Sequence, residues 1–98
     1  MDKFNEIISN SPLVLVDFYA TWCGPCQKMH PILEDLKEDM GTAIRIIKLD
    51  VDRNQQIAEQ FRVQSVPTLM LYKDGKVVWR QSGAQPLHEL KAVIEMYG

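Results

Sequence analysis

Hydrophobic residues follow two different periodicities in the first half of the chain. The segment 3–9 has apolar residues at positions 4, 7 and 8, which is the spacing of one helical face. The run LVLVDFY at 13–19 is almost continuously apolar, a pattern typical of a strand buried on both sides. Helical spacing returns over 25–40, where positions 29, 32, 33, 36 and 40 form a stripe. These patterns predict a helix, a central strand and a second, longer helix.

The second half of the chain contains shorter elements. A strand is predicted over 43–51 and a short helix over 54–61. The segments 68–72 and 77–81 are predicted as a β-hairpin, because the KDGK sequence between them holds an Asp-Gly turn signal. Pro86 opens a last helix, whose apolar face carries Leu87, Leu90, Ile94 and Tyr97.

This order of elements predicts an α/β fold in a single domain spanning 1–98. Strands separated by helices are expected to be parallel neighbours joined by right-handed crossovers. The final hairpin is expected to add an antiparallel edge. The predicted architecture is therefore a mixed four-stranded sheet with helices on both faces.

Composition narrows the classes of function. The chain has 98 residues, 46% hydrophobic and 24% charged, as in an ordinary globular domain. Its net charge of -2 gives no reason to expect nucleic acid or an anionic membrane as a partner. No apolar run approaches the roughly 20 residues of a membrane span, and the N-terminus does not resemble a signal peptide. We therefore expect a cytoplasmic protein, in which a cysteine pair is more often metal-binding or catalytic than structural.

Cys23 and Cys26 are the only cysteines, and three uses of such a pair are conceivable. As a structural disulfide, a loop of about four residues would contribute only about 2 kcal/mol, against nearly 5 for a ~100-residue loop. A zinc site needs three or four protein ligands. His30 and His88 are the only histidines, and each is expected to lie on an exposed helix surface. The sequence therefore predicts neither a metal site nor a structural disulfide.

The third use is thiol–disulfide exchange. Cys23 is expected at the start of the helix that Pro25 opens, where unpaired N–H groups and the helix dipole stabilise a thiolate. Cys26 follows one turn later, where it can attack a mixed disulfide formed by Cys23. Cys23 is therefore expected to be exposed, and Cys26 to be shielded within the first helical turn. Gly24 and Pro25 add no charge to stabilise the thiolate further, so the dithiol is expected to act as a reductant.

Asp17 interrupts the apolar run that leads into the cysteines. In a strand covered on both sides its carboxyl would be buried, and burial raises the pKa of a carboxyl group. Such a group could serve as a base for Cys26 near neutral pH. Lys48, on the predicted neighbouring strand, could be its partner. The alternatives are a solvent-exposed strand-edge aspartate and a surface lysine.

The motifs VDFYATWCGPC, KLDVD, VPTLMLYKDGK and SGA together resemble the thioredoxin family from about residue 4 to 97. The resemblance implies a thioredoxin fold, with Cys23 as nucleophile, Cys26 as resolving cysteine, and Asp17 as the buried acid–base group with the catalytic Lys48 near it. It also implies a cis peptide bond before Pro67. The apolar surface that receives partner proteins would comprise Trp22, Gly24, Pro25, Val66, Pro67, Gly83 and Ala84.

The implied function is that of a monomeric protein disulfide reductase that needs no bound cofactor or metal. Its partners would be disulfide-containing proteins, with a thioredoxin reductase as electron donor. The alternative is a thioredoxin-fold interaction module that holds one partner and turns over little. Members of the family usually begin with an additional strand, and nothing strand-like precedes residue 4 here. Tyr19 and Gln27 also depart from residues common at their positions.

Overall fold

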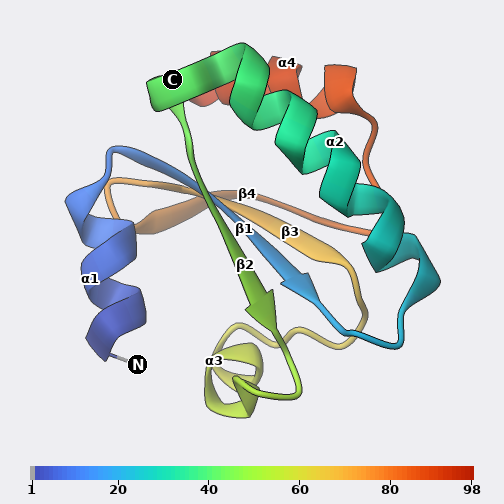
Figure 1. Ribbon diagram of the computed structural model, residues 1–98. Coiled ribbons are helices and arrows are strands. Elements are labelled where there is room, and N and C mark those ends of the chain that lie inside the picture. The colour runs from blue at the N-terminus through green and yellow to red at the C-terminus, as the bar shows by residue number, and fades with distance from the viewer. Residues whose placement is uncertain (1) are drawn as a thin grey trace.

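The computed structural model describes residues 2–98 and contains every element that the sequence predicts, with bounds within two residues of those expected (Figure 1). Helices and strands alternate before the C-terminal hairpin and helix. In chain order they are α1 (Asp2–Asn10), β1 (Leu13–Tyr19), α2 (Gly24–Met40), a 3-10 turn (Gly41–Ala43), β2 (Arg45–Asp50), α3 (Gln55–Gln60), β3 (Thr68–Lys73), β4 (Lys76–Ser82) and α4 (Leu87–Tyr97).

The four strands form one mixed sheet in the order β2-β1-β3-β4. β1 pairs with β2 in parallel, whereas β1–β3 and β3–β4 are antiparallel. Helices α2 and α4 cover one face of the sheet, and α1 and α3 lie on the other (Figure 1). The prediction of a mixed four-stranded sheet covered on both faces is confirmed.

The expected direction and position of β3 were wrong. β3 does not continue parallel to β2 but runs antiparallel to β1 on the opposite side of that strand. The six-residue helix α3 stays at the end of the sheet where β2 finishes, and β3 starts back from that end (Figure 1).

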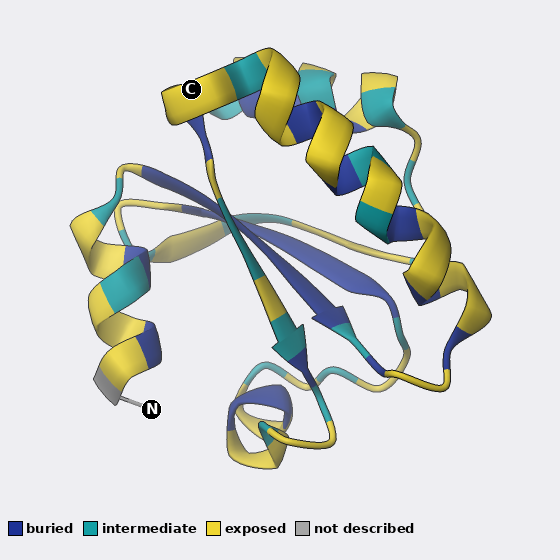
Figure 2. Cartoon of the chain, viewed as in Figure 1, coloured by how far each residue is buried: buried dark blue, intermediate teal, exposed yellow. Residues whose placement is uncertain are grey.

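The core consists of two apolar layers that share β1 and β3. Alternate residues of β1 enter different layers, with Leu13 and Leu15 facing α2 and α4 and Val14, Val16 and Phe18 facing α1 and α3. Figure 2 shows β1 and β3 as the most completely buried strands, with β2 and β4 more exposed at the edges. The two central strands are thus desolvated on both sides, which fixes the register of everything attached to their ends.

The hairpin between β3 and β4 has the turn that its sequence predicts. Lys73 pairs with Lys76, so the loop contains only Asp74 and Gly75. Both have positive φ angles, 51° and 84°, as a type I′ turn requires. The turn also rests on the chain between α1 and β1, because the Asp74 N–H donates to the carbonyl of Pro12 at 3.0 Å.

Packing of α2 on the sheet should control stability. Leu36 is fully buried in this helix, so Leu36→Ala removes packed methyl groups and leaves a cavity. We expect the free energy of unfolding to fall by about 2–5 kcal/mol. Glu38→Ala, at an exposed position of the same helix, should change it by less than about 0.5 kcal/mol. Urea denaturation of both variants measures the difference, and equal losses would show that α2 does not pack as described.

Candidate active site

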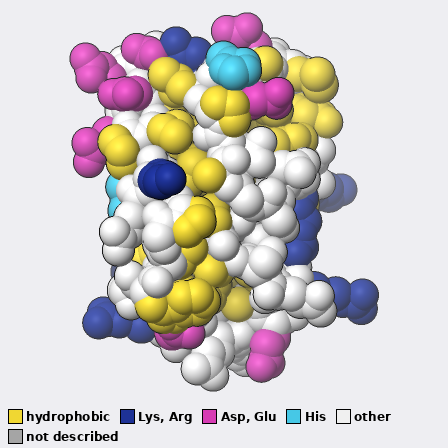
Figure 3. Space-filling view, turned by 90° about the vertical axis from the view of Figure 1, so that its right-hand side faces the viewer, with side chains coloured by type: hydrophobic (Ala, Val, Ile, Leu, Met, Phe, Trp, Pro, Cys, Tyr) yellow, Lys and Arg dark blue, Asp and Glu magenta, His cyan; other side chains and the backbone are white. Residues whose placement is uncertain are grey.

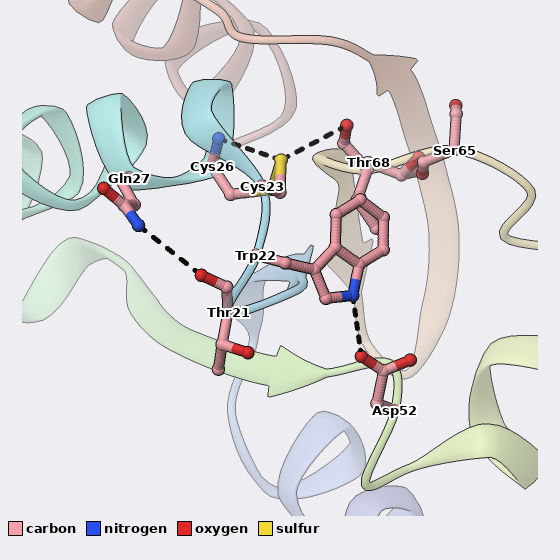
Figure 4. Close-up of a disulfide and its surroundings, with 9 residues drawn as sticks. Thr21, Trp22, Cys23, Cys26, Gln27, Asp52, Ser65 and Thr68 are labelled. Carbon is pink, nitrogen blue, oxygen red and sulfur yellow. Dashed lines mark hydrogen bonds between the residues drawn. A yellow bond between two sulfur atoms is a disulfide. The ribbon is translucent and has the colours of Figure 1, made fainter.

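The two cysteines lie where β1 leads into α2. Cys23 is the N-cap residue of α2, and Pro25 is in its first turn. Cys23 and Cys26 are joined by a disulfide with their Cα atoms 5.3 Å apart. The backbone N–H of Cys26 donates to Cys23 Sγ at 3.2 Å (Figure 4). One of the unpaired N–H groups at the start of the helix is therefore directed at the first sulfur, where it would stabilise a thiolate.

The two sulfurs differ in depth, although less than expected. Cys26 is fully buried, and Cys23 retains 5% of its surface. The expectation that Cys23 is openly exposed was wrong, because Ala20 and Val66 pack against it. Its Sγ lies 3.7 Å from the carbonyl oxygen of Val66. Of the two sulfurs, only that of Cys23 can be approached without moving the helix.

Asp17 is fully buried in the middle of β1. It lies on the sheet face that α2 covers, because it shares the alternation of Leu13 and Leu15. Neither carboxylate oxygen has a hydrogen-bond partner within residues 2–98. Burial raises the pKa of Asp17 to about 6, and the positive charge of Lys48 partly offsets that increase. A solvent-exposed strand-edge aspartate is thus excluded.

Lys48 is the cross-strand neighbour of Asp17 in the parallel β1–β2 pair. Its side chain is exposed, and the ion pairs found between the described residues do not join it to Asp17. Lys48 therefore acts on the Asp17 carboxyl only as a nearby positive charge at the protein surface. Because this effect is smaller than that of burial, the pKa of Asp17 stays raised.

The Val66–Pro67 peptide bond is cis, as the family resemblance implies. One hydrogen bond closes this turn on itself, and a second holds it beside the end of β4. Thr68 Oγ1 donates to the carbonyl of Ser65 at 2.7 Å, and the Gly83 N–H donates to the carbonyl of Pro67 at 2.8 Å. The sequence did not reveal the part played by Thr68, because its partners are set by the turn and not by spacing.

The residues expected to receive partners lie at the ends of several elements. Trp22, Gly24, Pro25 and Ala84 are exposed, with Trp22 at 71%. Val66 and Gly83 are half-buried and Pro67 is buried, so Pro67 shapes the surface more than it contributes to it. Figure 3 shows the side of the molecule on which the β1–α2 junction lies, with a band of hydrophobic atoms among mostly uncharged ones.

Asp52 is a site residue that sequence reasoning did not single out. Its carboxylate accepts a hydrogen bond from Trp22 Nε1 at 3.0 Å (Figure 4). The contact joins residues 30 positions apart, so only the fold brings them together. It limits the orientations of an otherwise exposed indole. In the first turns of α2, Gln27 Nε2 donates to the carbonyl of Thr21 in the preceding loop at 3.4 Å.

The histidines lie apart from any metal-like cluster. His88 is exposed as expected, but His30 is half-buried because its ring packs edge-on against Tyr19 with centroids 5.6 Å apart. Within residues 2–98, no three histidine, cysteine or acidic side chains are grouped so that they could hold a metal ion. Over the same residues, no helix is long and apolar enough to cross a membrane.

Comparison with known proteins agrees with this geometry. Residues 1–96 match the family model described as thioredoxin. The chain belongs to the thioredoxin family. It is 49% identical over 96 residues to a thioredoxin of Listeria monocytogenes, covering 98% of this chain and 93% of that one. It is also 43% identical over 94 residues to rice "Thioredoxin Y, chloroplastic", covering 95% of this chain and 56% of that one.

Solved thioredoxin structures have the same fold. A point mutant of the thioredoxin from Halobacterium salinarum superposes with a TM-score of 0.92 at 42% identity, over 99% of this chain and 84% of that one. With the Cys23–Cys26 pair, family membership makes the protein a thiol–disulfide oxidoreductase of the thioredoxin type. Thioredoxins act on disulfide substrates and are re-reduced by thioredoxin reductase systems.

The raised pKa of Asp17 should appear as a stability difference that depends on pH. Its folded value of about 6 exceeds the unfolded value of 3.8. Stabilisation by the bound proton is therefore complete below about pH 4 and is lost as the pH rises through 6. At pH 7 the buried anion costs up to roughly 3 kcal/mol. Asp17→Asn should accordingly be more stable than wild type at pH 7.

Urea denaturation at pH 4 and pH 7 measures this difference. The advantage of the asparagine variant should be small at pH 4 and should grow toward pH 7. A variant that is less stable than wild type at pH 7 would instead indicate that Asp17 is held as a favourable ion pair.

Proposed function

We propose that this protein reduces disulfides of partner proteins, with Cys23 as the attacking sulfur and Cys26 as the resolving one. The observation that carries these roles is the position of the pair at the start of α2. There Cys23 accepts an N–H and keeps some exposure, while Cys26 is sealed beneath the surface. A thiolate stabilised at a helix N-terminus is the reactive species in exchange.

The proposed cycle balances two electrons. The Cys23 thiolate attacks one sulfur of a partner disulfide, the partner S–S bond breaks, and the second partner sulfur leaves as a thiolate. Cys26 then loses its proton and attacks Cys23 Sγ, which breaks the mixed disulfide and releases the other partner thiolate. The protein is left with the Cys23–Cys26 disulfide seen in the structure. A thioredoxin reductase returns both electrons.

We assign the proton from Cys26 to Asp17. Two features support this role: the carboxyl lies on the face that α2 covers, and it has no competing hydrogen-bond partner among residues 2–98. With a pKa of about 6, caused by burial, it is largely ionised at pH 7 yet still a usable base. Lys48 would adjust that pKa from the solvent boundary, as its effect on the carboxyl suggests.

Partner proteins would bind the surface around the disulfide that Trp22, Gly24, Pro25, Val66, Pro67, Gly83 and Ala84 form. Its apolar and uncharged character supports contact with partners through shape and main-chain groups more than through ion pairs. Trp22 is suited to such a surface because it offers a large apolar area that its bond to Asp52 holds in place.

We further propose that residues 1–98 form one domain that works as a monomer in the cytoplasm. Both apolar layers share a single sheet, which supports one folding unit. A reducing compartment suits a dithiol reductant, because structural disulfides rarely persist there. A chloroplastic relative at 43% identity makes an organelle the other compartment to test. An interaction module with little turnover is not favoured, since it would need neither cysteine nor Asp17.

A turnover assay tests the function. Catalytic amounts of the protein should accelerate reduction of a protein disulfide by dithiothreitol, and Cys23→Ser should abolish the acceleration. Cys26→Ser should stop turnover but accumulate a mixed disulfide through Cys23, visible by mass spectrometry after alkylation. Equal trapping by Cys23→Ser and Cys26→Ser would overturn the assigned roles, and a wild-type protein without acceleration would overturn the function.

Loss of the Trp22 side chain should impair partner binding more than folding. We expect Trp22→Ala to raise KM for a protein disulfide by about tenfold, as loss of a contact worth over 1 kcal/mol does. The free energy of unfolding should change by less than about 1 kcal/mol. Met96→Ala is the matched control, because Met96 is 75% exposed but lies on α4. Equal KM values for the two variants would exclude Trp22 from the binding surface.

A further inference from the structure

The outer edge of β2 carries backbone groups that the sheet leaves free. β2 is a terminal strand and pairs only with β1 among the described residues. The Val51 N–H donates to the carbonyl of Tyr19 at 2.9 Å, so odd-numbered residues at this end of the strand direct their peptide groups toward β1. Because successive peptide groups of a strand alternate in direction, those of Ile46 and Lys48 point away from the sheet.

The outward carbonyl groups at both ends of β2 already have hydrogen-bond partners within the chain. The carbonyl of Ile44 accepts a hydrogen bond from Lys37 Nζ at 2.8 Å, and the carbonyl of Asp50 accepts one from Asn54 Nδ2 at 2.9 Å. Between these two carbonyl groups, residues 2–98 supply no partner for the outward groups of the strand. The open part of the edge is therefore short, comprising the N–H and C=O groups of Ile46 and Lys48, which suits pairing with one short extended segment.

An apolar cavity lies directly beside this open edge. It has a volume of about 270 Å³ and is bounded by α1, β2 and α3, on the side of the sheet away from α2. A cavity of about 150 Å³ is enough to hold benzene, so this one has room for an aromatic side chain. Its apolar lining comes from Phe4, Ile7, Ile47, Leu49 and Ile57.

Three exposed basic side chains lie around the edge, whereas the acidic Asp50 that ends β2 is buried. Lys3 borders the cavity, and Arg45 lies on the same face of β2 as the cavity-lining Ile47. Lys48 projects from the opposite face of the strand, and all three cations are exposed. A segment bound here would place its side chains alternately on these two faces, with cations close to both.

We propose that the open edge of β2 and its cavity form a docking site for an extended acidic segment of a partner protein. The segment pairs with the outward peptide groups of Ile46 and Lys48 as an added strand. One aromatic or branched side chain enters the cavity, and acidic side chains on either side of it meet Lys3 and Arg45. This site shares no residue with the surface around Cys23 and does not depend on disulfide exchange.

Charge favours such a partner over a second copy of the chain. An antiparallel two-fold β2–β2 pairing places the same face of both strands on the same side. In a register centred on Ile47, the two Lys48 side chains lie diagonal to each other across the strand pair. In a register centred on Lys48, they lie directly opposite each other. Like charges so placed are destabilising, and an edge lysine is a common device against strand-to-strand self-association.

Titration of isotope-labelled protein with synthetic peptides, followed by amide NMR shifts, tests the site. The probe is a capped seven-residue peptide with glutamate, phenylalanine and glutamate at alternate positions and threonine elsewhere. It should shift the amides of Ile46, Lys48 and the cavity residues while leaving Cys23 unaffected. Peptides with lysine for glutamate, or alanine for phenylalanine, should bind about tenfold more weakly or worse. The double variant Lys3→Glu/Arg45→Glu, altered only at exposed positions, should prefer the lysine peptide.

Two N-methylated peptides test strand pairing without altering the protein. One peptide is methylated on the odd-numbered peptide nitrogens and the other on the even-numbered ones, so each loses the N–H donors of one edge. Only one of these edges can face β2 in the bound peptide. One methylated peptide should lose binding and the other should keep it. Equal affinity for the acidic and basic peptides, shifts confined to the Cys23 region, or equal effects of the two methylations would each overturn the proposal. Self-association of the protein alone, seen as concentration-dependent shifts at β2, would assign the edge to a second copy.

Discussion

Strand β1 runs through the middle of the molecule with helices over both of its faces, so any side chain it carries up to Phe18 is removed from water. The site depends on this burial. Apolar side chains are stable at each of these positions, whereas an ionised carboxyl group is destabilised there because it loses its hydration. Asp17 is subject to this effect, which raises its pKa to about 6. The same strand delivers the chain to Cys23, so the chemistry and the core are properties of one seven-residue segment.

The start of α2 provides the second part of the site. Gly24 and Pro25 at the start of α2 have no side chain that could accept a hydrogen bond from the first N–H groups of the helix. The N–H of Cys26 is instead directed at the sulfur of the N-cap residue Cys23. The cis turn before Pro67 places Val66 against that sulfur, and the Gly83 N–H ties the turn to the end of β4. Segments from distant parts of the sequence therefore determine how far the Cys23 sulfur is covered.

Sequence patterns foresaw the elements well because each has its own periodicity. The apolar run around Asp17 correctly predicted that its carboxyl is buried, and the helix expected to open at Pro25 correctly predicted that Cys23 lies at a helix start. Periodicity could not foresee the direction of β3, which depends on where the short helix α3 lies relative to the sheet. Nor could it foresee how deeply Cys23 lies, since Val66 covers it from 43 positions away. The bond from Trp22 to Asp52 is equally a product of the fold.

The central claim is that β1, the strand that leads to the dithiol site, holds a buried carboxyl with no hydrogen-bond partner among residues 2–98. The most direct measurement is an NMR titration of the Asp17 side-chain carboxyl carbon in the oxidised protein, selectively labelled with carbon-13. A midpoint near pH 6 is predicted, because burial outweighs the attraction of Lys48. A midpoint at or below 3.8, the ordinary value for an aspartate, would contradict the account, since it would place Asp17 in water or in an ion pair.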